Sequence, residues 1–356
     1  QNHNNLSILF SALVLIYISY KVNRYGEFGN DAIGHLLFFY LISKMINYEK
    51  HNLSNFKNIY LISVFTVLNK FTLIFSLLIP AYLFFKDKFS FKKVVLTIPT
   101  LLLILWITRN VIVSGCIIYP QINTCFTDLK WSNEKTIIHI GEVSEAWAKD
   151  WPNRDDKNIS MKNYSKDFNW LKTWQNNHFE KISKTLIPYT IILLLIFLFF
   201  KFKNQNKNKF YFNSYNFKLP IIISFIGTIF FFLKFPIYRY GYSYLISFMI
   251  LSTIFFLRFY DFNKVKKLCF FVIFIFLASF LYKQTDRYTE FYENRNPIPK
   301  IYNEEKTYKK IQVNSGNFYN LSLNGSCMYD INLCTPYEDN NLTIKRIFSY
   351  KIFESK

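Results

Sequence analysis

The sequence predicts an all-α integral membrane protein with about seven or eight transmembrane helices. Two observations lead to this prediction: long apolar runs recur along the chain, and Lys and Arg gather on alternate loops between them. The apolar runs are residues 6–20, 59–85, 94–113, 185–200, 219–235, 242–257 and 268–282. Their lengths compare with the roughly 17–25 residues that a spanning helix needs.

These runs divide the chain into four parts. They are membrane helices in residues 1–113, a soluble Trp-rich insertion in 114–184, membrane helices in 185–282 and a small polar tail in 283–356. Residues 32–47 are apolar on one side but carry His35 and Lys44, so they either span the membrane or lie as a helix in its outer interface, which we favour. The chain begins at Gln1 without a signal-peptide pattern, which favours a fragment whose earlier helices are absent.

Three short loops carry an excess of Lys and Arg over acids, and the positive-inside rule assigns such loops to the cytoplasm. They lie within residues 86–93, 201–218 and 258–267. The insertion, the turn at 236–241 and the tail are then extracytoplasmic, and counting back from Lys86 places Asn58 outside as well. A multi-pass protein of a bacterial inner membrane follows. The formal charge of +20 is thus a topology signal and does not indicate nucleic-acid binding.

Four of the five cysteines form two close pairs in the segments assigned to the outside. The pairs are Cys116 with Cys125 and Cys327 with Cys334. This distribution predicts two disulfides formed in an oxidising compartment, with four free thiols as the alternative. No metal site is predicted, because no His lies near either pair to complete a tetrahedral set of ligands.

A few ionisable residues lie within the apolar runs or at their edges, where such side chains tend to face a cavity. Lys70 lies midway along one run, Arg109 and Asn110 lie at the outer end of another, and Arg239 lies in a tight outer turn. A guanidinium can form two charge-assisted hydrogen bonds to a phosphate, so we expect these four residues to bind one. Alternatively, the arginines extend to lipid headgroups and Lys70 pairs with a backbone carbonyl or a neighbouring helix.

Asp31, four residues after Glu27, is the best candidate for a catalytic acid. A carboxylate beside a phosphate site can take the proton from an attacking hydroxyl group or hold a metal ion. An Asp directly before a helix also serves as an N-cap, which is the structural alternative.

Five of the six tryptophans lie in the insertion. They are Trp131, Trp147, Trp151, Trp170 and Trp174. Trp147 and Trp151 are spaced by four, and so are Trp170 and Trp174, so each pair is expected to share one helical face. The indoles either stack on sugar rings or anchor short helices at the membrane interface, and we favour anchoring because Tyr and Lys accompany them. His139 and His178 are interpreted as structural.

Several short motifs follow one another along the chain. They are Arg24-Tyr25-Gly26-Glu27-Phe28-Gly29-Asn30-Asp31, Trp106-Ile107-Thr108-Arg109-Asn110 running to Ser114-Gly115 and Tyr119-Pro120, Ala146-Trp147-Ala148-Lys149-Asp150-Trp151-Pro152, Pro236-Ile237-Tyr238-Arg239-Tyr240-Gly241, and Cys327 with Cys334-Thr335-Pro336. The ordered set resembles a family of bacterial polytopic membrane proteins that is similar to the GT-C class of glycosyltransferases. The chain looks like the C-terminal two-thirds of such a protein.

The resemblance implies that a sugar is taken from a polyprenyl-phosphate carrier in an outer cavity, with membrane lipid as a further partner. It also implies a catalytic acid closer to the N-terminus than this chain reaches, so Asp31 is not equated with that acid. A divalent cation is left open as a cofactor. The expected function is therefore sugar transfer in cell-envelope polysaccharide assembly. The alternatives are a carrier or flippase for lipid-linked glycan and a non-catalytic membrane scaffold.

Overall fold

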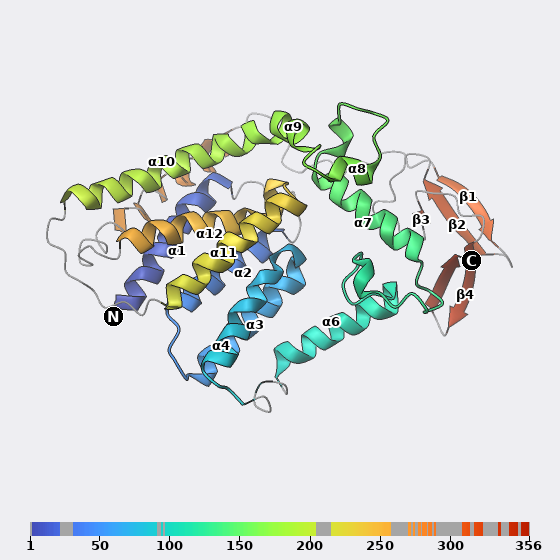
Figure 1. The fold of residues 1–356 in the computed structure, drawn as a ribbon, viewed down its shortest axis with the longest axis horizontal. Coiled ribbons are helices and arrows are strands. Elements are labelled where there is room, and N and C mark those ends of the chain that lie inside the picture. The colour runs from blue at the N-terminus through green and yellow to red at the C-terminus, as the bar shows by residue number, and fades with distance from the viewer. Residues whose placement is uncertain are drawn as a thin grey trace. The chain divides into compact units, whose positions relative to one another are not determined.

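A computed structural model shows two units, Gln1–Gln284 and Thr285–Lys356. The structure describes residues 2–21, 31–90, 94, 97–203, 215–257, parts of 270–289, and the strands of the second unit. The first unit is helical (Figure 1). Its described helices are α1 (Asn2–Lys21), α2 (Asp31–Ile46), α3 (Leu53–Asn69), η2 (Phe71–Leu77), α4 (Leu78–Lys86), α6 (Ile98–Ser114), η3 (Ile122–Thr124), α7 (Glu134–Ala148), η4 (Trp151–Asn153), α8 (Met161–Ser165), α9 (Leu171–Trp174), η5 (Gln175–Phe179), α10 (Glu180–Lys203), α11 (Tyr215–Lys234) and α12 (Tyr238–Leu257).

Three helical stretches in the described part of the chain are long and apolar enough to cross a membrane. They are Leu171–Leu198, Asn216–Lys234 and Tyr238–Leu257, and shorter apolar helices cover Leu6–Ile18, Ala32–Ile46, Phe71–Lys86 and Ile98–Ser114. The first unit is therefore mostly helical, with three candidate membrane-spanning helices, and the expected number of seven or eight spans stays a prediction. The predicted run 268–282 lies largely outside the described residues.

The predicted single span 59–85 is a helical hairpin. Lys70 leaves α3 in an extended conformation (φ −146°, ψ 100°), and the chain then returns along α3 as η2 and α4. Ser76 Oγ donates to the carbonyl of Ser63 at 3.3 Å, and the rings of Phe56 and Phe89 lie 4.7 Å apart. A cation midway along an apolar run is costly inside a membrane, and breaking the helix there places it at the end of the bundle.

The two ends of this hairpin lie at opposite ends of the helical bundle, which we call the Lys70 end and the Asp87 end. At the Asp87 end, the Tyr48 hydroxyl and the His51 amide both donate to Asp87 Oδ2. Burial, reinforced by the hydrogen bond to Asp87, raises the pKa of the Tyr48 phenol. Asn216, at the start of α11, donates to the carbonyl of Tyr48 at 2.9 Å.

The start of α3 therefore lies at the same end as the loop that begins at Lys86. The expectation that Asn58 lies across the membrane from Lys86 is wrong, because it counted one crossing where the structure has two antiparallel segments. The revised count leaves Asp31, at the start of α2, at the Lys70 end.

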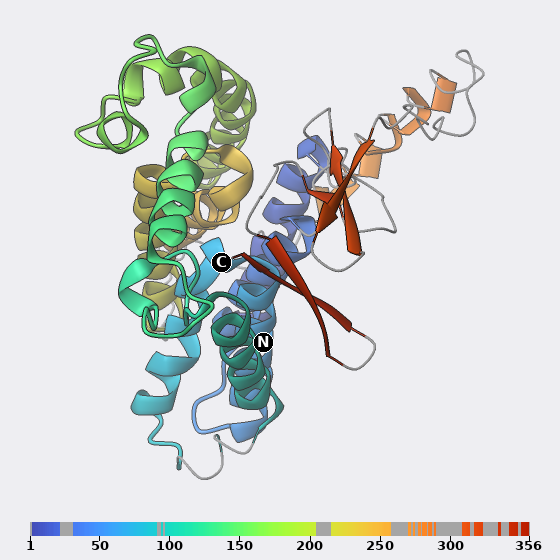
Figure 2. The same ribbon diagram turned by 90° about the vertical axis from the view of Figure 1, so that its right-hand side faces the viewer.

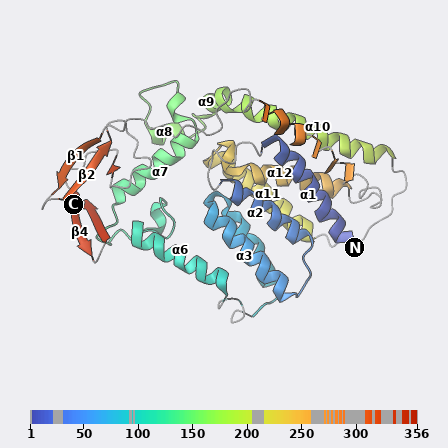
Figure 3. The same ribbon diagram turned by 180° about the vertical axis from the view of Figure 1, so that it is seen from behind.

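Helix α2 lies inside the bundle, against α1, α3 and α12 (Figure 3). Several of its apolar side chains are completely buried, among them Phe38, Leu41 and Ile42. Its other face carries the exposed side chains of Ile33, Leu36 and Tyr40. A helix resting in the membrane interface would turn a polar face to water, whereas a largely apolar exposed face suits contact with lipid, which favours the alternative in which α2 spans the membrane.

Helices α11 and α12 form the second close hairpin, and they lie side by side in Figure 1. Two glycines allow the helices to approach, since a Cβ on Gly227 would overlap the ring of Tyr244 and a Cβ on Gly241 would overlap that of Phe231. The turn between the helices carries Pro236 and places the start of α12 at the Lys70 end.

The insertion, coloured teal to green in Figure 2, leads from the end of α6 to α10. Trp151, Trp170 and Trp174 form a small core with Ala146 and Tyr164, so these indoles serve neither of the two roles that we expected. Trp174 Nε1 donates to the carbonyl of Pro236 at 2.8 Å, which fixes the insertion to the turn between α11 and α12.

The two tryptophan pairs differ in the structure. Trp170 and Trp174 pack together with ring centroids 6.2 Å apart, as their spacing predicts. Trp147 and Trp151 do not share a helical face, because α7 ends at Ala148 and Asp150 adopts a left-handed conformation (φ 70°). Trp147 is 55% exposed, whereas Trp151 is buried.

The second unit contains strands, so the all-α prediction is wrong there. The strands are β1 (Tyr308–Val313), β2 (Asn317–Ser322), β3 (Cys334–Thr335), β4 (Leu342–Ile347) and β5 (Tyr350–Ser355). β1 pairs antiparallel with β2 and β2 parallel with β3, while β4 and β5 form a separate antiparallel pair. In β4, the apolar residues Leu342 and Ile344 are two positions apart, which matches the period of a strand.

The hairpin of α3 and α4 predicts that Lys50 and Lys88, which flank it, lie on the same side of the membrane. Asn158, in the insertion, should lie on the other side. We expect Lys50→Cys and Lys88→Cys to react alike with a membrane-impermeant maleimide in intact cells, while Asn158→Cys reacts in the opposite sense. The labelling of the parent chain is subtracted as a control. If Lys50→Cys behaves like Asn158→Cys, residues 59–85 form one span and the hairpin is wrong.

Candidate functional site

Two cations from distant parts of the chain meet on one tyrosine ring at the Lys70 end. Lys70 Nζ lies 5.1 Å from the ring centroid of Tyr240, and Arg239 Cζ lies 4.9 Å from the same centroid. Arg239 Nη2 also donates to the Tyr240 hydroxyl at 3.0 Å. Lys70 is 6% exposed, so its ammonium group is held close to the protein. We call Lys70, Arg239 and Tyr240 the cation cluster.

Backbone contacts fix the two segments that carry the cluster. Thr72 Oγ1, just after the break at Lys70, donates to the carbonyl of Tyr240 at 2.8 Å. The Tyr244 hydroxyl donates in return to the carbonyl of Thr72 at 3.3 Å. These bonds tie η2 to the first turns of α12 and preorganise the cluster.

His35 on α2 supports the same turn of α12. Its Nε2 lies 2.7 Å from the carbonyl oxygen of Arg239, and its Nδ1 lies 2.7 Å from Ser243 Oγ. Because a carbonyl oxygen only accepts, Nε2 is assigned the proton. The imidazole also packs on Tyr242, with centroids 3.8 Å apart. His35 is therefore a positioning residue for the segment that carries Arg239.

Gly34, next to His35, brings α2 against the other cation. A Cβ at Gly34 would lie 2.7 Å from Lys70 Cβ, so a larger residue would push the Lys70 stem aside. Helix α2 begins at Asp31, one turn before His35. The side chain of Asp31 and all of Glu27 lie outside the described residues, so the role of Asp31 stays a prediction.

The electrostatics of the cluster favour an anion. Arg239 lies in the first turn of α12, where the partial positive charge of the helix N-terminus adds to that of the two side chains. Two cations near one ring repel each other, and a negative group beside them lowers that cost. Together Arg and Lys offer several donors, which suits a group with several acceptor oxygens such as phosphate.

Arg109 and Asn110 line a different pocket. This pocket of about 450 Å³ lies between the end of α6, the loop that follows it and the start of α7, and its lining residues include neither Lys70 nor Arg239. The two arginines do not share this pocket, and the expectation that Arg109 and Arg239 bind one phosphate stays a prediction. The pocket is linked to the cluster through α6, because Trp106 stacks on Phe71, the neighbour of Lys70, at 5.9 Å.

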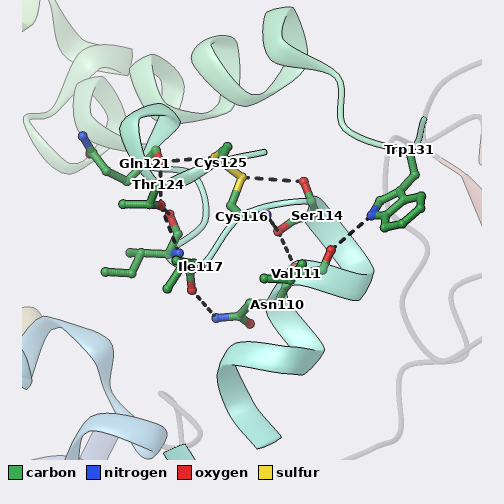
Figure 4. Close-up of a disulfide and its surroundings, with 10 residues drawn as sticks. Asn110, Val111, Ser114, Cys116, Ile117, Gln121, Thr124, Cys125 and Trp131 are labelled. Carbon is green, nitrogen blue, oxygen red and sulfur yellow. Dashed lines mark hydrogen bonds between the residues drawn. A yellow bond between two sulfur atoms is a disulfide. The ribbon is translucent and has the colours of Figure 1, made fainter. Parts of the chain in front are cut away.

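A disulfide closes the loop beside this pocket (Figure 4). The Cys116–Cys125 bond confirms the first predicted pair. Asn110 Nδ2 donates to the carbonyl of Ile117 at 3.1 Å, so its amide also braces the loop. Cys327 lies outside the described residues, and the second predicted disulfide stays a prediction. Among the residues that the structure does describe, no three His, Cys, Asp or Glu side chains lie close enough to hold a metal ion.

A buried acid holds the end of the insertion in place. Asp150 Oδ2 accepts from Asn177 Nδ2 at 2.6 Å, Asp150 Oδ1 accepts from Asn153 Nδ2 at 2.8 Å, and His178 Nε2 lies 3.5 Å from Oδ1. These contacts join the end of α7 to the helical stretch before α10, which agrees with a structural role for His178. His139, on α7, is exposed.

Sequence reasoning missed two residues of the site. Tyr240 stands in the quoted motif 236–241, but nothing local indicates that its ring receives both cations. His35 was visible as a lone histidine in an apolar stretch, and only the structure shows which turn it supports.

A family model described as a domain of unknown function, DUF8201, matches residues 1–246. The matched region contains the cation cluster, His35 and the Arg109 pocket, and it ends within α12. Searches of curated proteins and of solved structures each found no match. The chain therefore belongs to the family of the domain of unknown function DUF8201.

Proposed function

We propose that the protein binds a polyprenyl-phosphate-linked sugar at the Lys70 end and transfers the sugar to an acceptor during cell-envelope polysaccharide assembly, in the manner of a GT-C glycosyltransferase. The observation that carries the proposal is the convergence of Lys70 and Arg239 on Tyr240 at one end of a membrane-type bundle. Membrane-embedded cations that gather in one place are typical of binding sites for anionic substrates.

A phosphate that is esterified to a lipid fits this place for two reasons. The guanidinium of Arg239 can hold two phosphate oxygens at once, and the ammonium of Lys70 can hold a third. An apolar pocket of about 460 Å³, lined by Phe56, Tyr60 and Pro80 among others, lies between α3, α4 and α6. This pocket lies along the same hairpin, nearer the Asp87 end than Lys70 does, and it offers space for part of an isoprenoid chain.

The transfer step needs a base and stabilisation of the leaving group. In the proposed reaction, an acceptor hydroxyl attacks the anomeric carbon of the sugar, its proton passes to the carboxylate of Asp31, and the bond from that carbon to the phosphate oxygen breaks. Polyprenyl phosphate leaves with the bonding electrons. Lys70 and Arg239 stabilise the negative charge that grows on the phosphate as this bond breaks.

The proposal also assigns the two ends of the bundle. The Lys70 end and the insertion face the extracytoplasmic side, and the basic loop after Lys86 faces the cytoplasm, which matches the positive-inside rule. The antiparallel order of α1, α2, α3, α4, α6, α10, α11 and α12 gives eight membrane segments, with the α3–α4 hairpin counted as two, so α12 ends on the cytoplasmic side. The predicted run 268–282 then supplies one further crossing and places the tail 283–356 on the extracytoplasmic side.

The test follows the lipid-linked sugar in cells that make the Asp31→Asn variant. We expect lipid-linked sugar to accumulate in the outer leaflet, where membrane-impermeant periodate can oxidise it, and the envelope glycan to lose that sugar. Asp128→Asn, a change at an exposed acid of the insertion, is the matched control and should leave both unchanged.

Other outcomes contradict the transferase. Accumulated sugar that resists periodate would lie in the inner leaflet, and the protein would then be a carrier or flippase. No accumulation with Asp31→Asn, at normal levels of the variant protein, would remove Asp31 from the reaction and favour a scaffold.

A further inference from the structure

The Arg109 pocket has walls that are fixed by contacts independent of any ligand. The Cys116–Cys125 disulfide closes the loop on one side, and Trp131 Nε1 donates to the carbonyl of Val111 at 3.1 Å (Figure 4). On the other side, Asn133 caps α7 by accepting from the amide of Thr136 at 3.1 Å. A pocket with preset walls loses little conformational entropy when a ligand binds.

The lining of this pocket combines three kinds of chemistry. Tyr119 and Trp131 present aromatic surface and are 42% and 55% exposed. Thr136 presents a hydroxyl group and Arg109 presents a guanidinium, whereas the hydroxyl of Ser114 already donates to the carbonyl of Asn110 at 2.7 Å. The pocket is lined by polar and apolar surface together, unlike the apolar pocket between α3, α4 and α6.

A sugar ring with an acidic substituent matches this combination. The apolar face of a pyranose packs on an aromatic ring, its hydroxyl groups exchange hydrogen bonds with the hydroxyl of Thr136, and the planar fork of Arg109 binds a carboxylate or phosphate. The volume of about 450 Å³ lies within the range of small-molecule sites, roughly 300–1,000 Å³. A neutral lipid tail would form no ionic contact with the guanidinium of Arg109. A bare anion would not pack on the rings of Tyr119 and Trp131.

We propose that the Arg109 pocket is a binding site for an acidic sugar, separate from the cation cluster. Arg109 selects the acidic substituent, and Trp131 with Tyr119 selects the ring. Binding at this pocket does not depend on the proposed transfer reaction. Where transfer does occur, the pocket is placed to hold the acidic glycan that receives the sugar, because α6 joins it to the segment that carries Lys70.

Titration calorimetry of the full chain in lipid nanodiscs tests the proposal with four probes: glucuronate, glucose 6-phosphate, glucose and inorganic phosphate. Glucuronate and glucose 6-phosphate are expected to bind about ten- to hundredfold more tightly than glucose, the ratio that charge-assisted bonds to one Arg provide. Inorganic phosphate should bind more weakly than glucose 6-phosphate, because it lacks the ring.

Substitutions in the pocket, compared with two outside it, assign the effect to the pocket. Arg109→Gln should reduce the preference for glucuronate over glucose to about one, while Trp131→Ala should weaken all three sugars and Trp131→Phe should preserve part of their binding. Lys135→Gln changes an exposed cation of α7 outside the pocket lining and should alter nothing. Lys70→Met should leave the preference intact, so that failure of this proposal and failure of the proposed function can be told apart.

Several results would overturn the proposal. They are equal binding of glucuronate and glucose by the parent chain, an unchanged preference in Arg109→Gln, an equal loss in Lys135→Gln, and binding of inorganic phosphate as tight as that of glucose 6-phosphate.

Discussion

Replacing Arg239 by Lys is expected to weaken the binding of a polyprenyl phosphate by about ten- to hundredfold, although the charge is retained. The guanidinium of Arg239 lies over Tyr240 and bonds its hydroxyl, which holds the planar fork in one orientation. A Lys ammonium cannot form the bidentate contact, and losing one charge-assisted hydrogen bond costs about 1.5–3 kcal/mol.

The measurement compares a polyprenyl phosphate with the polyprenol of the same chain length in nanodiscs. Arg239→Lys should lower the affinity for the phosphate and leave that for the alcohol unchanged, because the alcohol carries no charge. Lys234→Gln is the matched control, since Lys234 ends the neighbouring helix and pairs with Glu145 at 3.2 Å. If Arg239→Lys weakens both lipids equally, the variant has disturbed the bundle and the phosphate contact is not supported.

Replacing Gly227 by Ala is expected to lower the free energy of unfolding by about 1–3 kcal/mol, the typical cost of overpacking. The added Cβ would overlap the ring of Tyr244, which is completely buried. That ring cannot move aside easily, because Phe38 lies 4.8 Å and Phe75 6.3 Å from its centroid. The hairpin of α11 and α12 would have to open, and α12 carries Arg239.

Thermal unfolding in detergent micelles, followed for the parent and the variants, measures this effect. Gly141→Ala is the matched control: its Cβ would lie 3.4 Å from the carbonyl of Pro120, and Ala gains up to about 1 kcal/mol over Gly in a helix. Gly141→Ala should therefore be neutral or stabilising. In the background of Tyr244→Ala, where the ring is absent, Gly227→Ala should lose its destabilising effect. A persistent loss there would mean that the ring overlap is not the cause.

Hydropathy located most helices of the first unit because their apolar runs are long. The runs at 219–235 and 242–257 correspond to α11 and α12. The run 59–85 predicts one span instead of a hairpin, because the mean hydropathy of an apolar window conceals one polar residue. Lys70 is the one residue in this run that signals the break, because a charged side chain is disfavoured in the middle of a membrane-spanning helix.

The site could be predicted only in part. Lys70 and Arg239 were recognisable one by one, because charged residues in or beside apolar runs are rare and costly. Their meeting on Tyr240 depends on contacts between residues about 170 positions apart, such as that from Thr72 to Tyr240, which no local pattern reveals. The tryptophan pairs show the same limit: a spacing of four predicts a shared face only while the helix continues, and α7 ends before Trp151.

The position of a bound phosphate tests the central claim most directly. An experimental structure of the protein in nanodiscs, with a polyprenyl phosphate added, should show the phosphorus atom at the Lys70 end, within hydrogen-bonding reach of both the Lys70 ammonium and the Arg239 guanidinium. A phosphate bound elsewhere, with Lys70 and Arg239 directed toward lipid headgroups, would contradict the account.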